Sequence, residues 1–231
     1  MKTIGLVGGT GWVSTLEYYR LLNQGVNERL GGHEAARCLL YSLNYGDIVR
    51  SKERDEGQAE VRVLVVDAAR LLERAGAGCL ALCANTLHWF ADDVEAATAI
   101  PLVHIADSTA GAIRERGMAR VGLLGTRPTM EQPFYRERLA ARGVEALVPA
   151  PADRGFVDDA IGNELVRAVF RPETRARFVG IMDDLGRRGA EGIVLGCTEI
   201  PLLVGPDDTD MPLFDTLRIH CAAIVEHALA G

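Results

Sequence analysis

The sequence lacks the features that mark membrane, secreted and nucleic-acid-binding proteins. No uncharged apolar run approaches the ~20 residues that a membrane-spanning helix needs, and the first residues pass into a strand-like run without the apolar region of a leader. Basic residues are outnumbered, since 25 Lys and Arg stand against 32 Asp and Glu for a net charge of −7. An acidic surface repels phosphate backbones, so we expect neither nucleic acid nor a membrane as a partner.

The sequence also lacks a disulfide framework and the common cofactor motifs. Its five cysteines are an odd number in a chain that we expect not to be secreted, so we expect reduced thiols and a cytoplasmic protein. It contains no C-x-x-C pair, and we predict no metal site. The glycine-rich segment 5–11 has neither the G-x-G-x-x-G order nor the G-x-x-x-x-G-K-[ST] order. We favour a turn whose backbone amides approach a small anion, with a plain tight turn as the alternative, and we expect no cofactor.

Short apolar runs alternate with longer helical patterns along the 231 residues. This alternation predicts an α/β fold of mainly parallel sheets covered by helices on both faces. The predicted strands are 3–8, 37–43, 77–82, 101–104, 120–125, 144–148, 192–196 and 212–214. Ser14 and Glu17 have capping-box spacing, which predicts a helix start at Ser14, and Thr129 with Gln132 repeats that spacing. Asn85 and Thr86 are candidate caps of another helix.

Three landmarks recur in the same order in the two halves of the chain. The turn glycines Gly8 and Gly125, the cysteines Cys83 and Cys197, and the Pro-Leu pairs at 101 and 212 are each separated by about 115 residues. This self-similarity predicts two similar α/β lobes related by a pseudo-twofold axis. We predict that residues 1–100 with 211–231 form the first lobe and that residues 101–210 form the second.

Cys83 and Cys197 are placed alike, because each follows an apolar strand and precedes small polar residues. Nearby helix N-terminal amides would lower the pKa of such thiols and favour the thiolate. Two thiols on opposite sides of one substrate could invert a stereocentre, since one removes a proton while the other delivers one. Cys38, Cys79 and Cys221 have no such surroundings and are interpreted as core residues.

Polar residues beside these cysteines could bind a substrate. Asn85, Thr86 and Thr198 offer amide and hydroxyl donors to a carboxylate, although helix capping is an alternative role for them. His88 could approach Cys83 from the following helix, and His104 ends a predicted strand. For both histidines, an ordinary core or solvated position is the favoured interpretation.

Several of these segments together resemble the aspartate/glutamate racemase family. The resemblance covers almost the whole chain and is greatest for the bacterial amino-acid racemases of broad specificity. It is carried by residues 4–9 with Thr15, Tyr18, Tyr19 and Asn23, by residues 83–86 and 104–107, by residues 125–127, 129–132 and 134–135, and by residues 196–200.

The resemblance implies an amino-acid racemase, an isomerase of two α/β lobes with the active site between them. It further implies no cofactor, Cys83 and Cys197 as the acid/base pair, and an amino acid as the small-molecule partner. The carboxylate of this substrate would be bound by Thr10, Asn85, Thr86 and Thr198, with Ala84 beside them. Members of the family commonly dimerise, so we expect a homodimer.

The chain departs from the family at the substrate's side-chain end. Thr10 replaces a larger apolar residue of the glycine loop, and the two cations of aspartate-preferring members have only Arg50 or Lys52, and Arg167, as candidates. Glu164 and Asp47 would oppose an acidic ligand. We therefore predict a substrate with a neutral side chain or a mixture of neutral and acidic ones. The alternatives are a related isomerase, decarboxylase or hydantoin racemase, or a non-catalytic amino-acid-binding protein.

Overall fold

The computed structural model describes residues 1–52 and 57–230, which form two compact units. Unit 1 contains Met1–His104 and the chain from His220 onward, and unit 2 contains Ile105–Ile219. The chain therefore crosses between the units twice, after His104 and after Ile219. Among the described residues, no helix is both long and apolar enough to span a bilayer.

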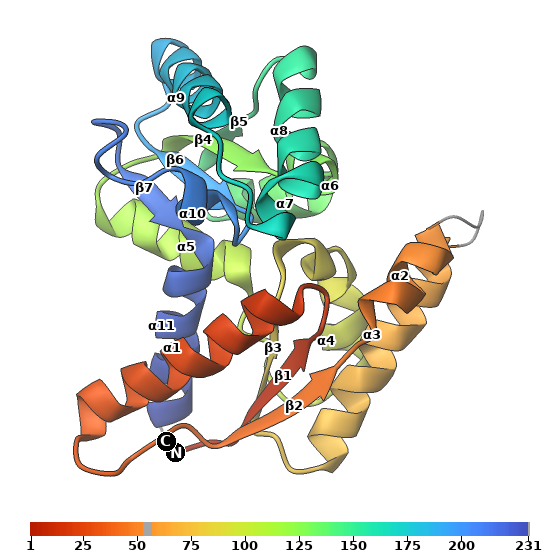
Figure 1. Cartoon of the computed structure of the whole chain (residues 1–231). Coiled ribbons are helices and arrows are strands. Elements are labelled where there is room, and N and C mark those ends of the chain that lie inside the picture. Colours follow the sequence, from red (N-terminus) through yellow and green to blue (C-terminus); the bar gives the residue numbers. More distant parts are fainter. Residues whose placement is uncertain (53–56, 231) are drawn as a thin grey trace. The chain divides into compact units, whose positions relative to one another are not determined.

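Unit 1 is built on a three-stranded parallel sheet in the order β2-β1-β3 (Figure 1). The strands are β1 (Ile4–Gly8), β2 (Cys38–Ser42) and β3 (Cys79–Leu82). The helices are α1 (Trp12–Leu30), α2 (Tyr45–Lys52), α3 (Gly57–Arg74), the 3-10 helix η1 (Asn85–Phe90) and α4 (Ala91–Ala97). Val7, Leu80 and Leu82 of the sheet pack with Val65 and Leu72 of α3 in one apolar core. Burial of these residues supplies most of the stability of such a unit.

Unit 2 is built on a four-stranded parallel sheet in the order β5-β4-β6-β7. The strands are β4 (Arg120–Gly125), β5 (Glu145–Leu147), β6 (Ile193–Gly196) and β7 (Leu213–Asp215). The helices are α5 (Ile105–Glu115), α6 (Arg127–Glu131), α7 (Pro133–Ala141), α8 (Pro151–Asn163), the 3-10 helix η2 (Leu165–Arg167), α9 (Pro172–Arg187) and α10 (Ile200–Leu203). The last helix, α11 (Thr216–Leu229), begins in unit 2 and ends in unit 1.

Helices cover both faces of the sheet in unit 2. Leu124 and Leu195 pack with α8 and α9 in one core, whereas Leu123 and Val194 pack with α5 and α7 in another. Neighbouring strand residues thus face opposite cores, which is why these strands are apolar throughout. The predicted α/β fold of mainly parallel sheets flanked by helices is confirmed.

The two sheets share one arrangement of strands. The first strand of each unit lies between the second and the third. In unit 1 an isolated bridge from Leu102 to Leu80 lies where β7 pairs with β6 in unit 2. The predicted strand at 101–104 is therefore wrong in its extent, because only Leu102 pairs. The lobe boundaries drawn from the sequence stay a prediction.

Several expected helix starts differ from the structure. Helix α1 begins at Trp12 with Gly11 as its N-cap, two residues before Ser14. Helix α6 has Thr126 as its N-cap, so Thr129 lies inside it. Likewise Ala84, and neither Asn85 nor Thr86, is the N-cap of η1. In all three cases the tight turn after a strand begins the helix earlier than the capping pattern indicates.

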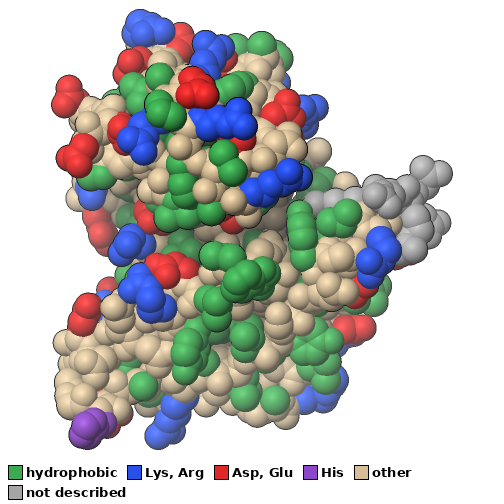
Figure 2. Space-filling model, in the orientation of Figure 1, with side chains coloured by type: hydrophobic (Ala, Val, Ile, Leu, Met, Phe, Trp, Pro, Cys, Tyr) green, Lys and Arg blue, Asp and Glu red, His purple; other side chains and the backbone are tan. Residues whose placement is uncertain are grey.

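The spacing of Leu16, Tyr19, Leu22, Val26 and Leu30 predicts that these residues form the buried face of α1, and this prediction is partly wrong. Leu22 and Val26 are buried, but Leu16 and Tyr19 are exposed, and Tyr18 is buried in their place. Figure 2 shows apolar side chains gathered on the surface over α1. The buried face of this helix includes the small polar residues Ser14 and Thr15 beside its apolar ones. A pattern of apolar residues alone does not reveal such a face.

Candidate active site

The glycine-rich segment after β1 is a tight turn held by its own helix. Gly9 has a positive φ of 89°, and a Cβ there would lie 2.0 Å from the carbonyl oxygen of Leu43. The Gly9 backbone N–H donates to Oγ1 of Thr15 (2.9 Å), which itself donates to the carbonyl of Gly11 (3.3 Å). Only glycine fits so close to another backbone segment, and the turn places Thr10 at the carboxyl end of β1.

Cys83 directly follows β3 in unit 1 and is buried. Its backbone N–H donates to the carbonyl of Val7 in the central strand (2.9 Å), which continues the sheet pairing by one residue. Ala84 and Asn85 then begin the 3-10 helix. Cys83 therefore lies at the carboxyl end of a parallel sheet, where α/β proteins bind ligands.

Cys197 directly follows β6 in unit 2 and is partly buried. Its thiol donates a hydrogen bond to Oε2 of Glu199 (2.9 Å), and the hydroxyl of Thr198 donates to the same oxygen (2.8 Å). A cysteine thus directly follows the third strand of each sheet, β3 and β6, so the two cysteines hold equivalent places in the two sheets.

The thiols differ from the sequence-based expectation in their acidity. Burial raises the pKa of Cys83 above its ordinary value. Burial also raises the pKa of Cys197, and the charge of Glu199 raises it further, whereas the backbone N–H groups of Thr198 and Glu199 oppose this more weakly. The prediction of thiols acidified by helix amides is therefore wrong, because desolvation penalises the thiolate more than those amides stabilise it.

Four of the predicted carboxylate-site residues adjoin the cysteines in sequence: Ala84, Asn85 and Thr86 follow Cys83 in unit 1, and Thr198 follows Cys197 in unit 2. The fifth, Thr10, follows β1 in unit 1. Oγ1 of Thr10 is buried and has no hydrogen-bond partner within the part of the chain that the structure describes. Asn85 is buried and Thr86 half-buried. The Ala84 carbonyl faces Nδ1 of His88 (2.9 Å), and the hydroxyl of Thr198 is used by Glu199. Among the described residues, the Thr10 hydroxyl is therefore left without a hydrogen-bond partner, and Ala84 contributes only its carbonyl, which accepts from His88.

The candidate cations for an acidic side chain lie in exposed positions or outside the described atoms. Arg50 is exposed and pairs with Asp47 one turn earlier on α2. Arg167 is exposed in η2, and the side chain of Lys52 lies outside the described residues. Glu164 accepts a hydrogen bond from Thr174 (2.7 Å) and pairs with Arg171 at 3.8 Å, so its contacts belong to the packing of α9.

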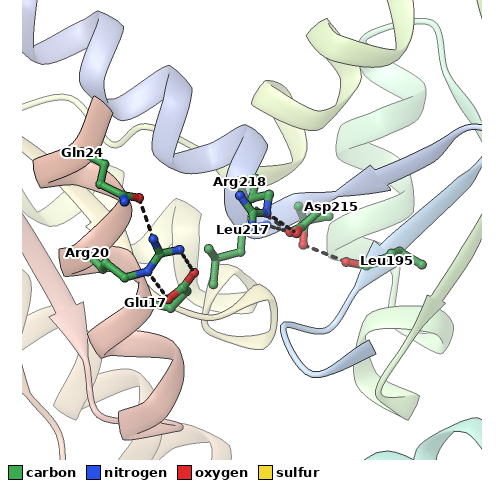
Figure 3. Close-up of polar contacts among 8 residues, drawn as sticks. Glu17, Arg20, Gln24, Leu195, Asp215, Leu217 and Arg218 are labelled. Carbon is green, nitrogen blue, oxygen red and sulfur yellow. Dashed lines mark hydrogen bonds and ion pairs between the residues drawn. The ribbon is translucent and has the colours of Figure 1, made fainter. Parts of the chain in front are cut away.

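Polar contacts also fix the start of α11 beside β6. Oδ1 of Asp215 accepts from the backbone N–H groups of Leu217 (3.0 Å) and Arg218 (3.2 Å), as Figure 3 shows. Oγ1 of Thr216 donates to the carbonyl of Leu195 (2.9 Å), two residues before Cys197. A second group in Figure 3, in which Arg20 of α1 binds Glu17 and Gln24, lies on the exposed surface of that helix.

Sequence reasoning missed two residues that contact these segments. The motif 196–200 includes Glu199 without indicating a role for it, whereas in the structure its carboxylate accepts the hydrogen bond of the Cys197 thiol. The sequence indicates that His88 could approach Cys83 but favours an ordinary core or solvated position, and the structure places its ring against the backbone next to Cys83. Their spacing of two and five residues from the cysteines was the available signal. Within residues 1–52 and 57–230, no three metal-binding side chains lie where they could hold a metal ion together.

Comparisons with known proteins decide the family. The model of the Asp/Glu/hydantoin racemase family matches residues 7–224. The chain belongs to this racemase family. Its members are isomerases, and the resemblance drawn from the sequence motifs is confirmed.

Individual relatives support this membership. A Yersinia pestis protein assigned to the Asp/Glu racemases is 43% identical, with a TM-score of 0.93 over 99% of this chain and 100% of that one. An aspartate racemase homologue from Pyrococcus horikoshii is 34% identical, with a TM-score of 0.85 over 99% of both chains. The broad-specificity amino-acid racemase RacX of Bacillus subtilis is 25% identical over 74% of each chain. The two solved structures share the fold of this chain, and the names of the three relatives point to different amino-acid substrates.

Proposed function

We propose that this family member is a cofactor-independent amino-acid racemase that inverts Cα with the thiols of Cys83 and Cys197. The observation that carries the proposal is the equivalent placement of the two cysteines. Each directly follows the third strand of a parallel sheet and precedes polar residues. Core cysteines have no reason to recur at this position in both units, whereas a reaction with two acid/base groups needs one from each.

In the proposed reaction, a thiolate removes the proton from Cα and the opposite thiol protonates the resulting carbanion on its other face. The thiolate of Cys197 would form when its proton passes to the Glu199 carboxylate, which already accepts the thiol hydrogen bond. Cys83 would then donate its proton to Cα and become the thiolate. The same steps in reverse convert the other enantiomer, so both thiols change role with direction while no proton is gained or lost.

Donors near the cysteines would bind the substrate's α-carboxylate. Oγ1 of Thr10 is buried with no partner among the described residues, and a buried hydroxyl without a partner costs roughly 1–3 kcal/mol that a bound carboxylate would recover. The Asn85 amide and the Thr86 hydroxyl offer further donors. Thr198 would contribute after its bond to Glu199 rearranges.

We further propose a substrate with a neutral or mixed side chain. A buried acidic side chain requires a cation or several hydrogen bonds to offset its desolvation. Arg50 is already paired with Asp47, and Arg167 is exposed. The broad-specificity name of one relative agrees with this preference. A homodimer and a cytoplasmic location also stay predictions, the first measurable by analytical ultracentrifugation.

The test is to incubate the protein with each L-amino acid in deuterated water without added cofactor. We expect solvent deuterium to enter Cα as the D-isomer appears, detected by proton NMR and chiral chromatography. A Cys83→Ala/Cys197→Ala double variant controls for contaminating racemases. Saturable amino-acid binding without deuterium incorporation would contradict the proposal and indicate a binding protein, and release of carbon dioxide would indicate a decarboxylase.

A further inference from the structure

Unit 1 contains three buried histidines that the reaction does not use. His88, His104 and His220 are at most 4% exposed. The ring centroids of His88 and His104 are 4.6 Å apart, and those of His88 and His220 are 5.6 Å apart. His88 belongs to η1, and His104 is the last residue before the chain enters unit 2. His220 is the first residue after the chain returns to unit 1. The cluster therefore joins parts of unit 1 that are distant in sequence.

The hydrogen bonds of His220 fix the state of its ring. Nε2 lies 2.7 Å from the carbonyl oxygen of Val103, and Nδ1 lies 2.8 Å from the hydroxyl of Tyr18. A carbonyl can only accept, so Nε2 carries the proton. Burial lowers the pKa of His220 to about 4, so the ring is neutral and Nδ1 accepts from Tyr18. His220 thus links α1 to the segment that carries His104.

His88 has the opposite proton arrangement. Nδ1 lies 2.9 Å from the carbonyl oxygen of Ala84, so Nδ1 carries the proton. Burial and the neighbouring histidines lower the pKa of His88 well below its ordinary value, and the ring is neutral. Because Ala84 adjoins Cys83, this bond fixes the peptide that follows the cysteine.

We propose that Tyr18 and His220 are positioning residues that, through His104 and His88, hold the backbone of Ala84 and the adjoining Cys83 in place. The role rests on the proposed function of Cys83. An acid/base group must be held within about 0.5 Å of its productive geometry by supporting contacts. The sequence of contacts is continuous: Tyr18 donates to His220, His220 donates to Val103, His104 follows Val103, and His104 packs on His88.

The first test measures how fast each cysteine is alkylated by iodoacetamide, resolved by peptide mass spectrometry. Cys79 and Cys83 are equally buried and lie four residues apart, so Cys79 reports general loosening of unit 1. Tyr18→Phe removes only the donated hydroxyl, and His220→Gln keeps a donor near Val103 but loses the acceptor for Tyr18. We expect the Cys83 to Cys79 rate ratio to rise at least about fivefold in both variants, because the loop opens locally.

The matched control is Tyr19→Phe, the adjacent tyrosine of α1, which is 54% exposed. We expect its rate ratio to equal that of the parent. We also expect kcat for racemisation to fall about tenfold in Tyr18→Phe with KM within about twofold, because misplaced groups slow the chemical step more than binding. An unchanged ratio, or equal acceleration at Cys79 and Cys83, would overturn the proposal.

A second measurement uses the unaltered protein and applies even if a variant fails to fold. The nitrogen-15 shifts of the imidazole rings report which nitrogen is protonated. We expect His220 protonated at Nε2 and His88 at Nδ1. Any other tautomer at either ring removes one of the hydrogen bonds and overturns the proposal. Neither readout needs turnover, so a parent protein that racemises no amino acid would contradict the proposed function while the rate ratio still decides the linkage to Cys83.

Discussion

The thiol of Cys197 donates a hydrogen bond to Oε2 of Glu199 across 2.9 Å. The same oxygen also accepts a hydrogen bond from the hydroxyl of Thr198. One carboxylate oxygen therefore holds the side chains of both Cys197 and Thr198. Burial raises the pKa of Cys197, so in the proposed reaction this thiol would need a nearby base to take its proton. Glu199, which already accepts the thiol hydrogen bond, would be that base.

Glu199→Gln should therefore slow racemisation. The amide cannot take the thiol proton, and we expect kcat/KM to fall by roughly 10²-fold, the usual effect of losing an acid/base group. Chiral chromatography in both directions measures the loss. Glu226→Gln, at an exposed glutamate of α11 paired with Arg29, is the control and should match the parent. Racemisation by Glu199→Gln at the parent rate would remove Glu199 from the mechanism.

Either cysteine variant should abolish most of the racemisation. Cys83→Ala and Cys197→Ala each remove one of the two proton carriers, and we expect losses of at least roughly 10²-fold. Cys38→Ala, at a partly buried cysteine of β2, should leave the rate nearly unchanged, since it loses only packing. The mechanism is wrong if Cys83→Ala retains the parent rate.

The substrate preference should favour a neutral side chain or show no strong bias. The comparison is kcat/KM for homoserine against aspartate and glutamate. Because Arg50 is paired with Asp47, we expect kcat/KM for the acidic substrates to exceed that for homoserine by less than about 100-fold. A ratio of about 100 corresponds to about 2.7 kcal/mol of transition-state binding. A larger preference for aspartate or glutamate would show that a cation reaches the side chain, and Lys52→Ala and Arg167→Ala would then identify it.

Folding stability should fall as the pH drops from about 6.5 towards 4. The pKa of His220 is about 4 in the folded protein against 6.5 ordinarily, so the unfolded chain binds more protons in this window and gains stability relative to the fold. Tyr18 and His88 face this ring, and His104 packs in turn on His88. The lowered pKa of His88 acts in the same direction.

Titration of His220 should lower the free energy of unfolding by about 3 kcal/mol as the pH falls through this range. Urea unfolding at pH 7, 5.5 and 4.5 measures it. His220→Gln cannot titrate, so its free energy of unfolding should decline less steeply than that of the parent. Equal slopes would contradict the buried, neutral state of the ring.

Gly9→Ala should destabilise the protein more than Gly31→Ala. Both glycines have positive φ, 89° and 75°, but only at Gly9 would a Cβ meet another backbone segment, at Leu43. We expect Gly31→Ala to cost roughly 1–3 kcal/mol for the backbone conformation alone, because its φ of 75° and ψ of −174° suit only glycine, and we expect Gly9→Ala to cost clearly more. Urea unfolding of both variants decides this, and equal costs would show that the turn can move away from Leu43.

The sequence by itself determined the alternation of strands and helices, the duplication, and the two cysteines at equivalent strand ends. These follow from local apolar runs and short motifs, which neighbouring residues specify. The tertiary structure alone decided what surrounds the cysteines. The hydroxyl of Tyr18 meets His220 across 202 residues of chain, and the acidity of Cys83 depends on burial by distant segments. Desolvation and hydrogen bonding depend on spatial neighbours, and only the packed fold brings those neighbours together.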